Sequence, residues 1–324
     1  MQNFLSIDSH TDPVQLLERA LARKRDPLAL RDFGDGQTLG LIFMNPSLRT
    51  RMSTQKAATN LGMNVIALNA GGAESWKIET EPGVVMDGEK QEHIVDAARV
   101  ISSYCDIVGL RTFASLEDRA TDLADPILHA FADASSVPVV NMESAAGHPL
   151  QGLADMMTIH ERCEEKSIER PRVVLSWAPH PRALPQAVPN SFAAWSRAMD
   201  YDLVITHPEG YDLDERFTEG ATIEPDRDTA FDGADIVYAK NWSATEPYGE
   251  VLTRDPSWTV DTDAMSRTRE AIFLHCLPVR RNVVVTDAVI DAPTSRVVAQ
   301  AKNREYAAQA VLAELLMQGV EESP

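Results

Sequence analysis

The chain has 324 residues, a length that allows two domains of ordinary size, each with its own hydrophobic core. Its 44% hydrophobic content is that of a globular protein, and no apolar run approaches the roughly 20 residues that a membrane span needs. The formal net charge of −19 argues against nucleic-acid binding, which needs a basic face. An anionic ligand therefore requires a local positive site. An ordinary acidic enzyme explains this charge, and adaptation to high salt is the weaker hypothesis.

Neither the N-terminus nor the cysteines indicate an extracellular protein. Residues 1–6 lack the basic and apolar regions of a signal peptide. Cys105, Cys163 and Cys276 are odd in number and widely spaced, which argues against a disulfide framework or a zinc site. We therefore expect a cytoplasmic protein that contacts no membrane.

Strands and helices alternate along the chain, which predicts parallel βαβ units. In the first half we expect strands at 38–44, 64–68, 106–110 and 137–142, and helices at 13–24, 52–61, 91–104 and 122–134. In the second half we expect strands at 172–177, 203–206, 236–239 and 271–275, and helices at 150–164, 187–198, 260–268 and 301–317. The expected fold class is α/β, with two domains that each have a central, mostly parallel sheet flanked by helices.

The alternation restarts near residue 150, which suggests a domain boundary. Residues 1–147 form the expected first domain and residues 148–300 the second, and a C-terminal helix at about 301–318 is expected to pack back on the first. Ligands of such folds bind beyond the carboxyl ends of the strands, so we expect the active site in the cleft between the domains. The long segment 69–88, with Trp76 in its middle, is a candidate functional loop.

The motif Asn45-Pro46-Ser47-Leu48-Arg49-Thr50-Arg51 lies between a buried strand and a helix. Ser47 is placed to cap that helix, and Asn45-Pro46 ends the strand. Backbone N–H groups, the helix dipole, two hydroxyls and two guanidinium groups then meet in a small volume that suits a phosphate. The alternative is a capped surface helix with a basic first turn, although arginines in a first turn oppose the helix dipole.

Further polar residues follow predicted strands or begin helices. His148 and Gln151, three residues apart at a helix start, can both reach one carbonyl or amide, and a capping histidine is the alternative. Arg111 follows a buried strand and can bind an oxyanion or form a surface ion pair, and Arg304 is another potential phosphate ligand. Cys276 is a nucleophile, a polar lining residue or a small buried hydrophobe. No acid–base partner for it is visible, so covalent catalysis is not favoured.

Three of these motifs occur together in the order and spacing of one family. The segments that begin at Ser47, His148 and His275 resemble the carbamoyltransferase family, which includes the ornithine and aspartate carbamoyltransferases, and the resemblance covers nearly the whole chain. It implies these carbamoyl phosphate-binding residues: Ser47, Leu48, Arg49, Thr50, Trp76, Arg111, His148, Pro149, Leu150, Gln151, Cys276, Leu277 and Arg304. It implies these catalytic residues: Arg49, Thr50, Arg111, His148, Gln151 and Cys276. No metal or organic cofactor is implied.

The chain departs from ordinary ornithine carbamoyltransferases in two places. Their Ser-Met-Gly loop is missing, with Ala239-Lys240-Asn241-Trp242 in that region, and paired arginines follow Val279. Both features resemble the branch of the family that acts on N-acylated ornithine. This resemblance implies contacts to the acylated amino acid from Glu143, His180, Lys240 and Arg280. From their charge and hydrogen-bonding groups, Gln91, Arg182 and Arg280 are candidate contacts to the acyl group. It also implies a homotrimer in which Trp76 completes the site of a neighbouring subunit.

The reaction that the resemblance implies is transfer of the carbamoyl group of carbamoyl phosphate to the δ-amine of an N-acylornithine, in arginine biosynthesis. We expect a succinyl rather than an acetyl group, and the argument rests on the residue before Glu92-His93. In the family this residue is glutamate in the acetyl branch and proline in the succinyl branch. Gln91 matches neither, but it adds no negative charge beside a succinyl carboxylate. Alternatives are N-acetylornithine, another amine such as putrescine, and a non-catalytic carbamoyl phosphate-binding homologue. No general base for the δ-amine is evident.

Overall fold

The computed structural model describes residues 3–9, 12–70 and 76–321, and the chain divides into two compact units. The first unit comprises Met1–Ala114, Thr121–Leu150 and Arg304–Pro324, and the second comprises Ser115–Ala120 and Gln151–Asn303. Two of the boundaries fall inside long helices, α6 (Pro149–Lys166) and α12 (Val297–Glu321). Within the described ranges, every helix is too short or too polar to cross a membrane.

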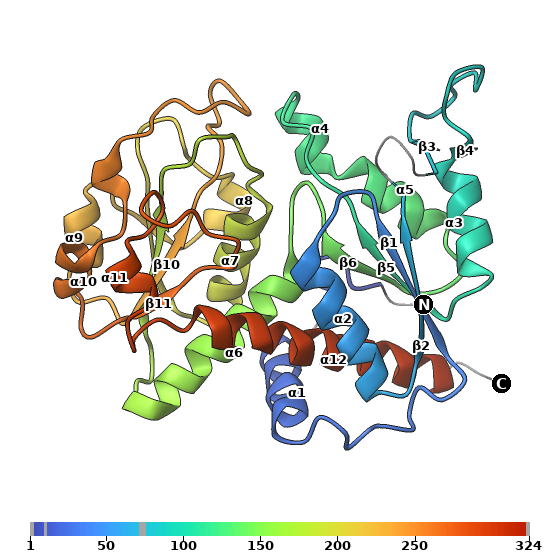
Figure 1. The fold of residues 1–324 in the computed structure, drawn as a ribbon, viewed down its shortest axis with the longest axis horizontal. Coiled ribbons are helices and arrows are strands. Elements are labelled where there is room, and N and C mark those ends of the chain that lie inside the picture. Colours follow the sequence, from blue (N-terminus) through green and yellow to red (C-terminus); the bar gives the residue numbers. More distant parts are fainter. Residues whose placement is uncertain (1–2, 10–11, 71–75, 322–324) are drawn as a thin grey trace. The chain divides into compact units, whose positions relative to one another are not determined.

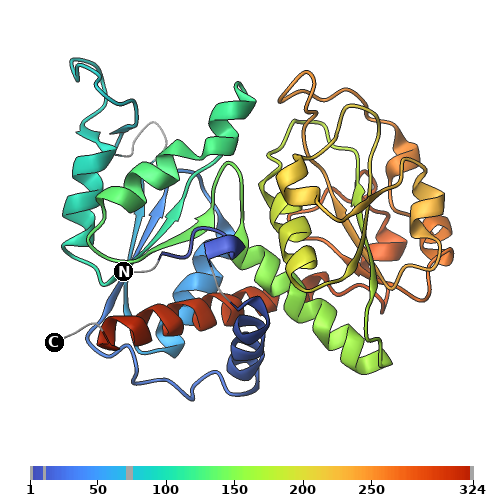
Figure 2. The ribbon, with the colours of Figure 1, turned by 180° about the vertical axis from the view of Figure 1, so that it is seen from behind.

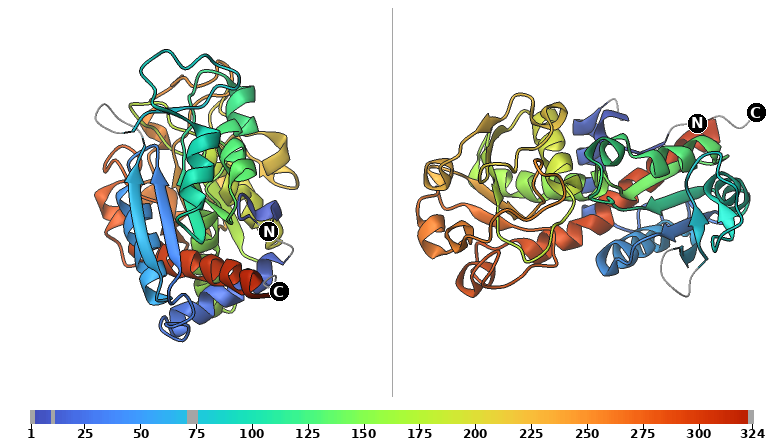
Figure 3. Two further views of the ribbon diagram at one scale, coloured as in Figure 1. Left: turned by 90° about the vertical axis from the view of Figure 1, so that its right-hand side faces the viewer. Right: turned by 90° about the horizontal axis from the view of Figure 1, so that it is seen from above.

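The first unit is built on a four-stranded parallel sheet (Figure 1). Its strands, in spatial order, are β2 (Asn64–Asn69), β1 (Thr38–Phe43), β5 (Ile107–Arg111) and β6 (Val139–Glu143). The left view of Figure 3 shows β1 and β2 running side by side. Four of the five residues of β5 are apolar or glycine and all five are buried, as expected for a strand that is covered on both faces.

Helices cover both faces of this sheet. Helices α3 (Ile94–Ser102) and α5 (Pro126–Ala134) pack together, and Ile94 and Phe131 contribute to a core with Val108 of the sheet. Helices α1 (Pro13–Arg25), α2 (Leu48–Asn60) and α12 form the other group, in which Asn60 donates to Glu305 at 2.9 Å and Arg19 pairs with Glu314 at 2.6 Å. Figure 2 shows α12 beside α1. The residues after Asn303 thus complete the first unit's own helical layer.

The second unit has a five-stranded parallel sheet. Its strands, in spatial order, are β11 (Ile272–Leu274), β10 (Ile236–Lys240), β7 (Arg172–Trp177), β8 (Asp202–Thr206) and β9 (Thr222–Ile223). Its remaining helices are α7 (Ala187–Ala198), α8 (Glu215–Thr218), α9 (Arg227–Phe231), α10 (Thr262–Ser266) and α11 (Asp287–Ile290), with a 3₁₀ turn at Pro256–Trp258. Side chains of α9, α10 and α11 share one core with the sheet.

Helix α6 approaches α7 at a glycine. A Cβ atom on Gly152 would lie 2.1 Å from the Trp195 ring, so no other residue fits there without a shift. Trp195 is fully buried, and Phe192 of the same helix packs on Tyr238 of β10 with the ring centroids 4.3 Å apart. The contact fixes α6, and with it the residues next to Gly152, against the second unit's core.

The predicted alternation of strands and helices is confirmed, and every ladder in both large sheets is parallel. Several predicted helices have different bounds: α2 begins at Leu48 rather than at 52, α12 spans Val297–Glu321 rather than 301–317, and two others differ for a local structural reason. The helix at 122–134 is two helices, α4 (Arg119–Ala124) and α5, because Asp125 is left-handed (φ 50°) and Pro126 begins a new helix. The helix at 91–104 is shorter, because Glu92–His93 form strand β4, which pairs with β3 (Ile78–Glu79). The sequence pattern also missed the short elements β9, α8, α9 and α11.

Candidate active site

The turn between β1 and α2 has the capped helix start that its sequence predicts. Ser47 is the N-cap of α2, and its Oγ accepts from the Thr50 backbone N–H at 3.4 Å. The first turn of α2 contains no acidic residue, and Arg49 lies half-buried in it. Arg51 packs over the Phe43 ring, with its guanidinium carbon 4.3 Å from the ring centroid. The helix start therefore combines N–H donors with positive charge, which favours an anion.

Four buried side chains of the first unit, which we call the anion cluster, gather near this helix start: Thr50, Arg111, His148 and Arg304. Each is less than one tenth exposed. The Arg304 Nη2 donates to Thr50 Oγ1 at 2.6 Å and to His148 Nε2 at 3.3 Å. Residues far apart in the sequence, from α2, β5, α12 and the residue before α6, are thus brought together. Two buried guanidinium groups favour a compact anion such as phosphate.

Arg111 and Glu143 form an ion pair inside this unit. They are direct neighbours across the β5–β6 ladder, which shifts register between Leu110 and Arg111. Arg111 is the last residue of its strand, and its backbone carbonyl accepts from Met44 N–H at 2.9 Å. Both side chains therefore lie at the carboxyl edge of the sheet, where ligands of such folds bind. The surface ion pair considered for Arg111 is instead a buried one.

His148 is a neutral histidine in this cluster. Burial lowers its pKa well below the usual value, and the positive charges of Arg304 and Arg111 lower it further. The 3.5 Å approach of its Nε2 to Glu143 is therefore not an ion pair near neutral pH. Since arginine only donates, Nε2 accepts from Arg304 and the ring proton lies on Nδ1. A neutral imidazole with one N–H donor can polarise a carbonyl oxygen without adding a full charge.

This lowered pKa predicts a pH effect on stability. As pH falls through about 6.5, the unfolded chain takes up a proton at His148 while the folded chain does not, so the folded state loses stability. Between pH 7.5 and 5.5 the free energy of unfolding should fall by about 1 kcal/mol more in the native protein than in His148→Asn. Urea denaturation of both proteins measures this difference. An equal pH dependence in the two would mean that His148 titrates normally when folded.

A buried carboxylate holds the turn that precedes His148. Asp125 accepts from the Ala145 N–H at 3.1 Å, from the Ala146 N–H at 3.2 Å and from the Ser144 hydroxyl. Burial raises the Asp125 pKa, and these hydrogen bonds oppose that rise. The bonds close the turn one residue before His148, which explains how a loop can present a buried imidazole in one orientation.

In the second unit, Gln151 and the segment after β11 carry further candidates. Gln151 is 1% exposed, and Cys276 and Leu277 are partly exposed. Leu277 has a left-handed backbone (φ 54°), which is uncommon for a branched residue and is often found at functional sites. Its N–H donates to His275 Nδ1 at 2.9 Å, which fixes the turn. Cys276 lies near the buried Tyr238 hydroxyl, and burial is the main reason why the pKa of that hydroxyl is raised.

A second basic group, also in the second unit, comprises His180, Arg182, Lys240 and Arg280. Burial lowers the pKa of His180, and the charges of Lys240, Arg280 and Arg182 lower it further, so the four lie close enough to interact. Lys240 is 7% exposed and donates to the Asn241 carbonyl. Arg281 instead pairs with Asp287 and Asp291 on the surface. The adjacent Arg280 has no ion pair with any described residue, which leaves its guanidinium available to a carboxylate ligand.

Trp76 and Gln91 lie at the small β3–β4 sheet of the first unit. The Trp76 indole is 56% exposed and donates to Glu92 at 2.7 Å. Gln91 exchanges two bonds with Lys77: its N–H donates to the Lys77 carbonyl at 3.0 Å, and its Oε1 accepts from the Lys77 N–H at 2.8 Å. The amide nitrogen of Gln91 therefore remains as a donor. Residues 71–75 of the predicted functional loop lie outside the described residues.

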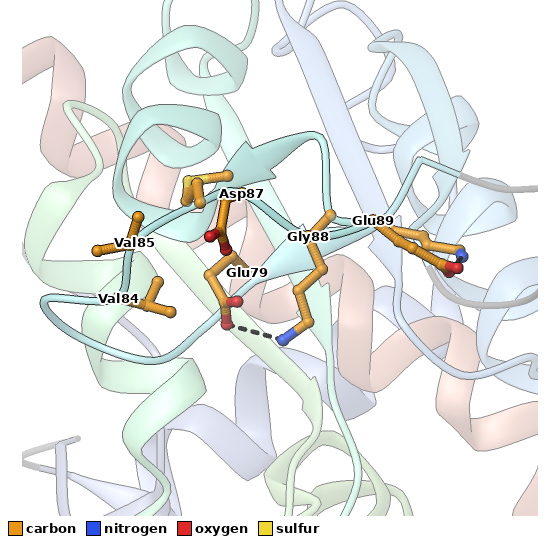
Figure 4. Close-up of a pocket in the computed structure, with 9 residues that line it drawn as sticks. Glu79, Val84, Val85, Asp87, Gly88 and Glu89 are labelled. Atoms are coloured by element: carbon orange, nitrogen blue, oxygen red, sulfur yellow. Dashed lines mark hydrogen bonds and ion pairs between the residues drawn. The ribbon is translucent and has the colours of Figure 1, made fainter.

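A pocket of about 480 Å³ lies in the following segment, lined by Lys77, Glu79 and residues 84–90. Glu79 and Lys90 form an ion pair at 2.7 Å. Figure 4 shows a dashed line from Glu79 and the side chains of Val84 and Val85. The bond from Lys90 holds the Glu79 pKa at about 2. No predicted site residue lines this pocket, and its two lysines are paired with Glu79 and Glu89, so the lining does not suit a phosphate.

Sequence patterns missed the residues that hold the site residues in place. Asp125 lies in what reads as an ordinary helix, and its contacts are about 20 residues away in sequence. Asp155 accepts hydrogen bonds from both Gln151 and Gln300. Only the first of these contacts could have been predicted from the sequence, because Gln151 and Asp155 are four residues apart on one helix. The sequence predicted a contact from Glu143 to the substrate, but it did not predict the ion pair between Glu143 and Arg111.

Two parallel α/β units, one of which gathers buried arginines and a capped helix start, define an α/β protein that binds a phosphate-like anion. Two family models match the chain: "Aspartate/ornithine carbamoyltransferase, carbamoyl-P binding domain" at residues 2–161, and "Aspartate/ornithine carbamoyltransferase, Asp/Orn binding domain" at residues 186–315. The chain therefore belongs to the aspartate/ornithine carbamoyltransferase family.

Individual relatives agree with this assignment. An N-succinylornithine carbamoyltransferase of Bacteroides thetaiotaomicron is 50% identical, over 98% of this chain and 99% of its own length. An N-acetylornithine carbamoyltransferase of Xanthomonas campestris pv. campestris is 37% identical over 94% of each chain. The solved structure of an acetylornithine transcarbamylase complexed with acetylcitrulline matches with a TM-score of 0.90 at 36% identity, covering 97% of this chain and 99% of that one.

Proposed function

We propose that this protein transfers the carbamoyl group of carbamoyl phosphate to the δ-amine of N2-succinyl-L-ornithine, giving N-succinylcitrulline and phosphate in arginine biosynthesis. The observation that carries the proposal is the 50% identity, over almost the full length of both chains, with an N-succinylornithine carbamoyltransferase. Identity with an N-acetylornithine carbamoyltransferase is lower, at 37%.

Carbamoyl phosphate is proposed to bind at the anion cluster and the start of α2. In the first unit the proposed contacts are Ser47, Leu48, Arg49, Thr50, Arg111, His148, Pro149, Leu150 and Arg304, with Trp76 from a neighbouring subunit. In the second unit they are Gln151, Cys276 and Leu277. The buried arginines and the helix start support the phosphate contacts, because each supplies charge or N–H donors to an anion.

The reaction needs a good leaving group and a neutral amine. The δ-nitrogen attacks the carbamoyl carbon, the bond from that carbon to the phosphate oxygen breaks, and the phosphate leaves with the bonding electrons. The amine loses its proton, and the departing phosphate is a chemically reasonable acceptor. Arg49, Arg111 and Arg304 stabilise the leaving phosphate, while Thr50 and His148 polarise the carbamoyl oxygen. Positioning of the two substrates supplies much of the rate.

The N-acylornithine is proposed to contact Glu143 and the second unit's basic group of His180, Arg182, Lys240 and Arg280. Two carboxylates of a succinylated substrate match several cations, whereas an acetylated one carries a single carboxylate. Glu143 pairs with Arg111 through Oε2, and its Oε1 can accept from the substrate's amide N–H. Solved structures of N-acetyl-L-ornithine transcarbamylase variants with one glutamate replaced contain carbamyl phosphate and N-succinyl-L-norvaline. We propose that Gln91 occupies the position of that replaced glutamate in this protein and selects the acyl group.

We further propose a homotrimer in which Trp76 of one subunit completes the site of the next. Mixing Arg49→Ala subunits with Trp76→Ala subunits should restore part of the activity that each variant lacks, because some sites in the mixed oligomer carry neither substitution. The indole of Trp76 is exposed within its own chain, which is the supporting observation. Absence of any recovery in verified mixed oligomers would argue against shared sites.

Cys276→Ala should retain a substantial fraction of the native kcat, within about tenfold, because the proposed chemistry uses no thiolate nucleophile. Steady-state kinetics with both substrates measures this. Loss of all activity in a folded variant that still binds carbamoyl phosphate would assign the thiol a chemical step.

Incubation of the purified protein with carbamoyl phosphate and N-succinyl-L-ornithine tests the proposed function. The expected products are phosphate in equal amount to a compound with the mass of N-succinylcitrulline. A protein that binds carbamoyl phosphate but forms no citrulline derivative from any N-acylornithine would be the non-catalytic homologue.

A further inference from the structure

A buried hydrogen-bond network in the second unit has Asp155 at its centre. Asp155 lies one helical turn after Gln151 in α6 and is fully buried. Its Oδ1 accepts from the Gln151 amide nitrogen and from the Gln300 amide nitrogen, each at 2.6 Å. Gln300 is itself fully buried, in the second unit's part of α12. One carboxylate oxygen thus holds two side-chain amides from different helices.

The network continues to the segment after β11. The Oε1 of Gln300 accepts from the His275 backbone N–H at 2.9 Å, and His275 Nδ1 accepts from the Leu277 N–H at 2.9 Å. The left-handed backbone of Leu277 is unfavourable for a branched residue and persists only where its surroundings fix it. The carboxylate that holds Gln151 therefore also supports, through Gln300, the turn that carries Cys276 and Leu277.

Asp155 determines which end of the Gln151 amide is presented. A carboxylate oxygen can only accept hydrogen bonds, so Asp155 Oδ1 binds the NH₂ of Gln151 rather than its carbonyl oxygen. The Gln151 Oε1 is then turned away from Asp155. This oxygen is buried and has no hydrogen-bond partner among the described residues, an arrangement that is unfavourable unless a ligand supplies an N–H donor.

We propose that Asp155 is a positioning residue that fixes the Gln151 amide so that its carbonyl oxygen accepts from the NH₂ of the carbamoyl group. The inference rests on the proposed function and deepens it. Asp155 does not touch the substrate, and its effect is selectivity for an acyl phosphate that carries an N–H. Acetyl phosphate, which has a methyl group in place of the NH₂, would leave the Gln151 oxygen unpaired and should bind more weakly.

The test compares the dissociation constants of carbamoyl phosphate, acetyl phosphate and inorganic phosphate by calorimetric titration. The native protein should prefer carbamoyl phosphate to acetyl phosphate by about tenfold or more. In Asp155→Leu, which is similar in size but accepts no hydrogen bond, this preference should fall to about threefold or less, with inorganic phosphate binding within about twofold of native. Asp155→Asn, which keeps an acceptor oxygen, should retain most of the preference.

Two further variants separate positioning from general stability. Thr158→Val removes another buried hydrogen bond of α6, to Asn303, without touching Gln151, and should keep the native preference. In a Gln151→Met background the preference should already be lost, and adding Asp155→Leu should lower it no further. Should Asp155→Leu fail to fold, Asp155→Ser replaces it, since its short hydroxyl cannot reach both amides.

The outcomes distinguish this inference from the proposed function. A folded native protein with no preference for carbamoyl phosphate over acetyl phosphate would contradict the contact between Gln151 and the carbamoyl NH₂, whereas absence of carbamoyl transfer to any N-acylornithine would contradict the proposed function itself. A native preference that survives unchanged in folded Asp155→Leu or Asp155→Ser would contradict the role of Asp155 alone. A fall in preference of the same size in Thr158→Val would mean that buried polar contacts of α6 matter generally, which also contradicts a specific role for Asp155.

Discussion

Arg49→Ala should lower kcat by about 10- to 100-fold or more, because the leaving phosphate loses a charge-assisted partner worth about 1.5–3 kcal/mol at a helix start that already favours an anion. Arg49 lies half-buried in the first turn of α2, where no acidic residue opposes it. Steady-state kinetics with varied carbamoyl phosphate measures kcat and KM separately. Arg49→Lys should recover only part of the loss, since one ammonium cannot reproduce the two parallel donors of a guanidinium.

Lys56→Ala is the matched control for this result. It removes one positive charge from an exposed site two turns further along α2, so it reports the effect of net charge alone. Its kcat should stay within about twofold of native, because an exposed charge at that distance is screened by salt. A loss of less than tenfold in Arg49→Ala would show that Arg49 does not bind the transferred phosphate.

Gln91→Glu should lower kcat/KM for N-succinylornithine by about tenfold or more and leave N-acetylornithine much less affected. Gln91 Oε1 accepts from the Lys77 N–H at 2.8 Å, and a glutamate can keep that bond. The second oxygen of the glutamate then places a negative charge where the glutamine has an NH₂ donor. A succinyl carboxylate nearby loses a donor and gains a like charge, which can cost several kcal/mol when both are desolvated.

Gln37→Glu adds the same charge just before β1, at the amino end of the four-stranded sheet, whereas Gln91 adjoins the separate β3–β4 sheet; it controls for the effect of charge on an already acidic protein. It should change neither substrate's kcat/KM by more than about twofold. An unchanged ratio of the two substrates in Gln91→Glu would show that position 91 does not select the acyl group.

Local patterns were sufficient wherever a structure depends on neighbouring residues. The apolar run before Asn45 and the capping position of Ser47 predicted β1 and the start of α2, because both depend on contacts within a few residues. The break at Asp125 was missed, although the following proline signals it, because the apolar pattern continues through both helices. The two-residue strands β3 and β4 were also missed, since two residues show no periodicity.

The side-chain contacts of the site were less predictable. The motifs placed Arg111, His148 and Arg304 in one site by resemblance, but not the neutral state of His148, which depends on burial and two nearby guanidinium groups. Nor does any local pattern reveal that Asp155 joins Gln151 to Gln300, about 145 residues away. Such contacts are set by how the helices pack, which no window of sequence contains.

The most direct test of the proposed function is the ratio of kcat/KM for N-succinyl-L-ornithine, N-acetyl-L-ornithine and ornithine, measured on the native protein at one salt concentration with saturating carbamoyl phosphate. We predict the highest value for N-succinyl-L-ornithine, a value at least about tenfold lower for N-acetyl-L-ornithine, and negligible transfer to ornithine. Equal or better use of N-acetyl-L-ornithine would contradict the proposed acyl group, and transfer to none of the three would contradict the proposed carbamoyltransferase activity.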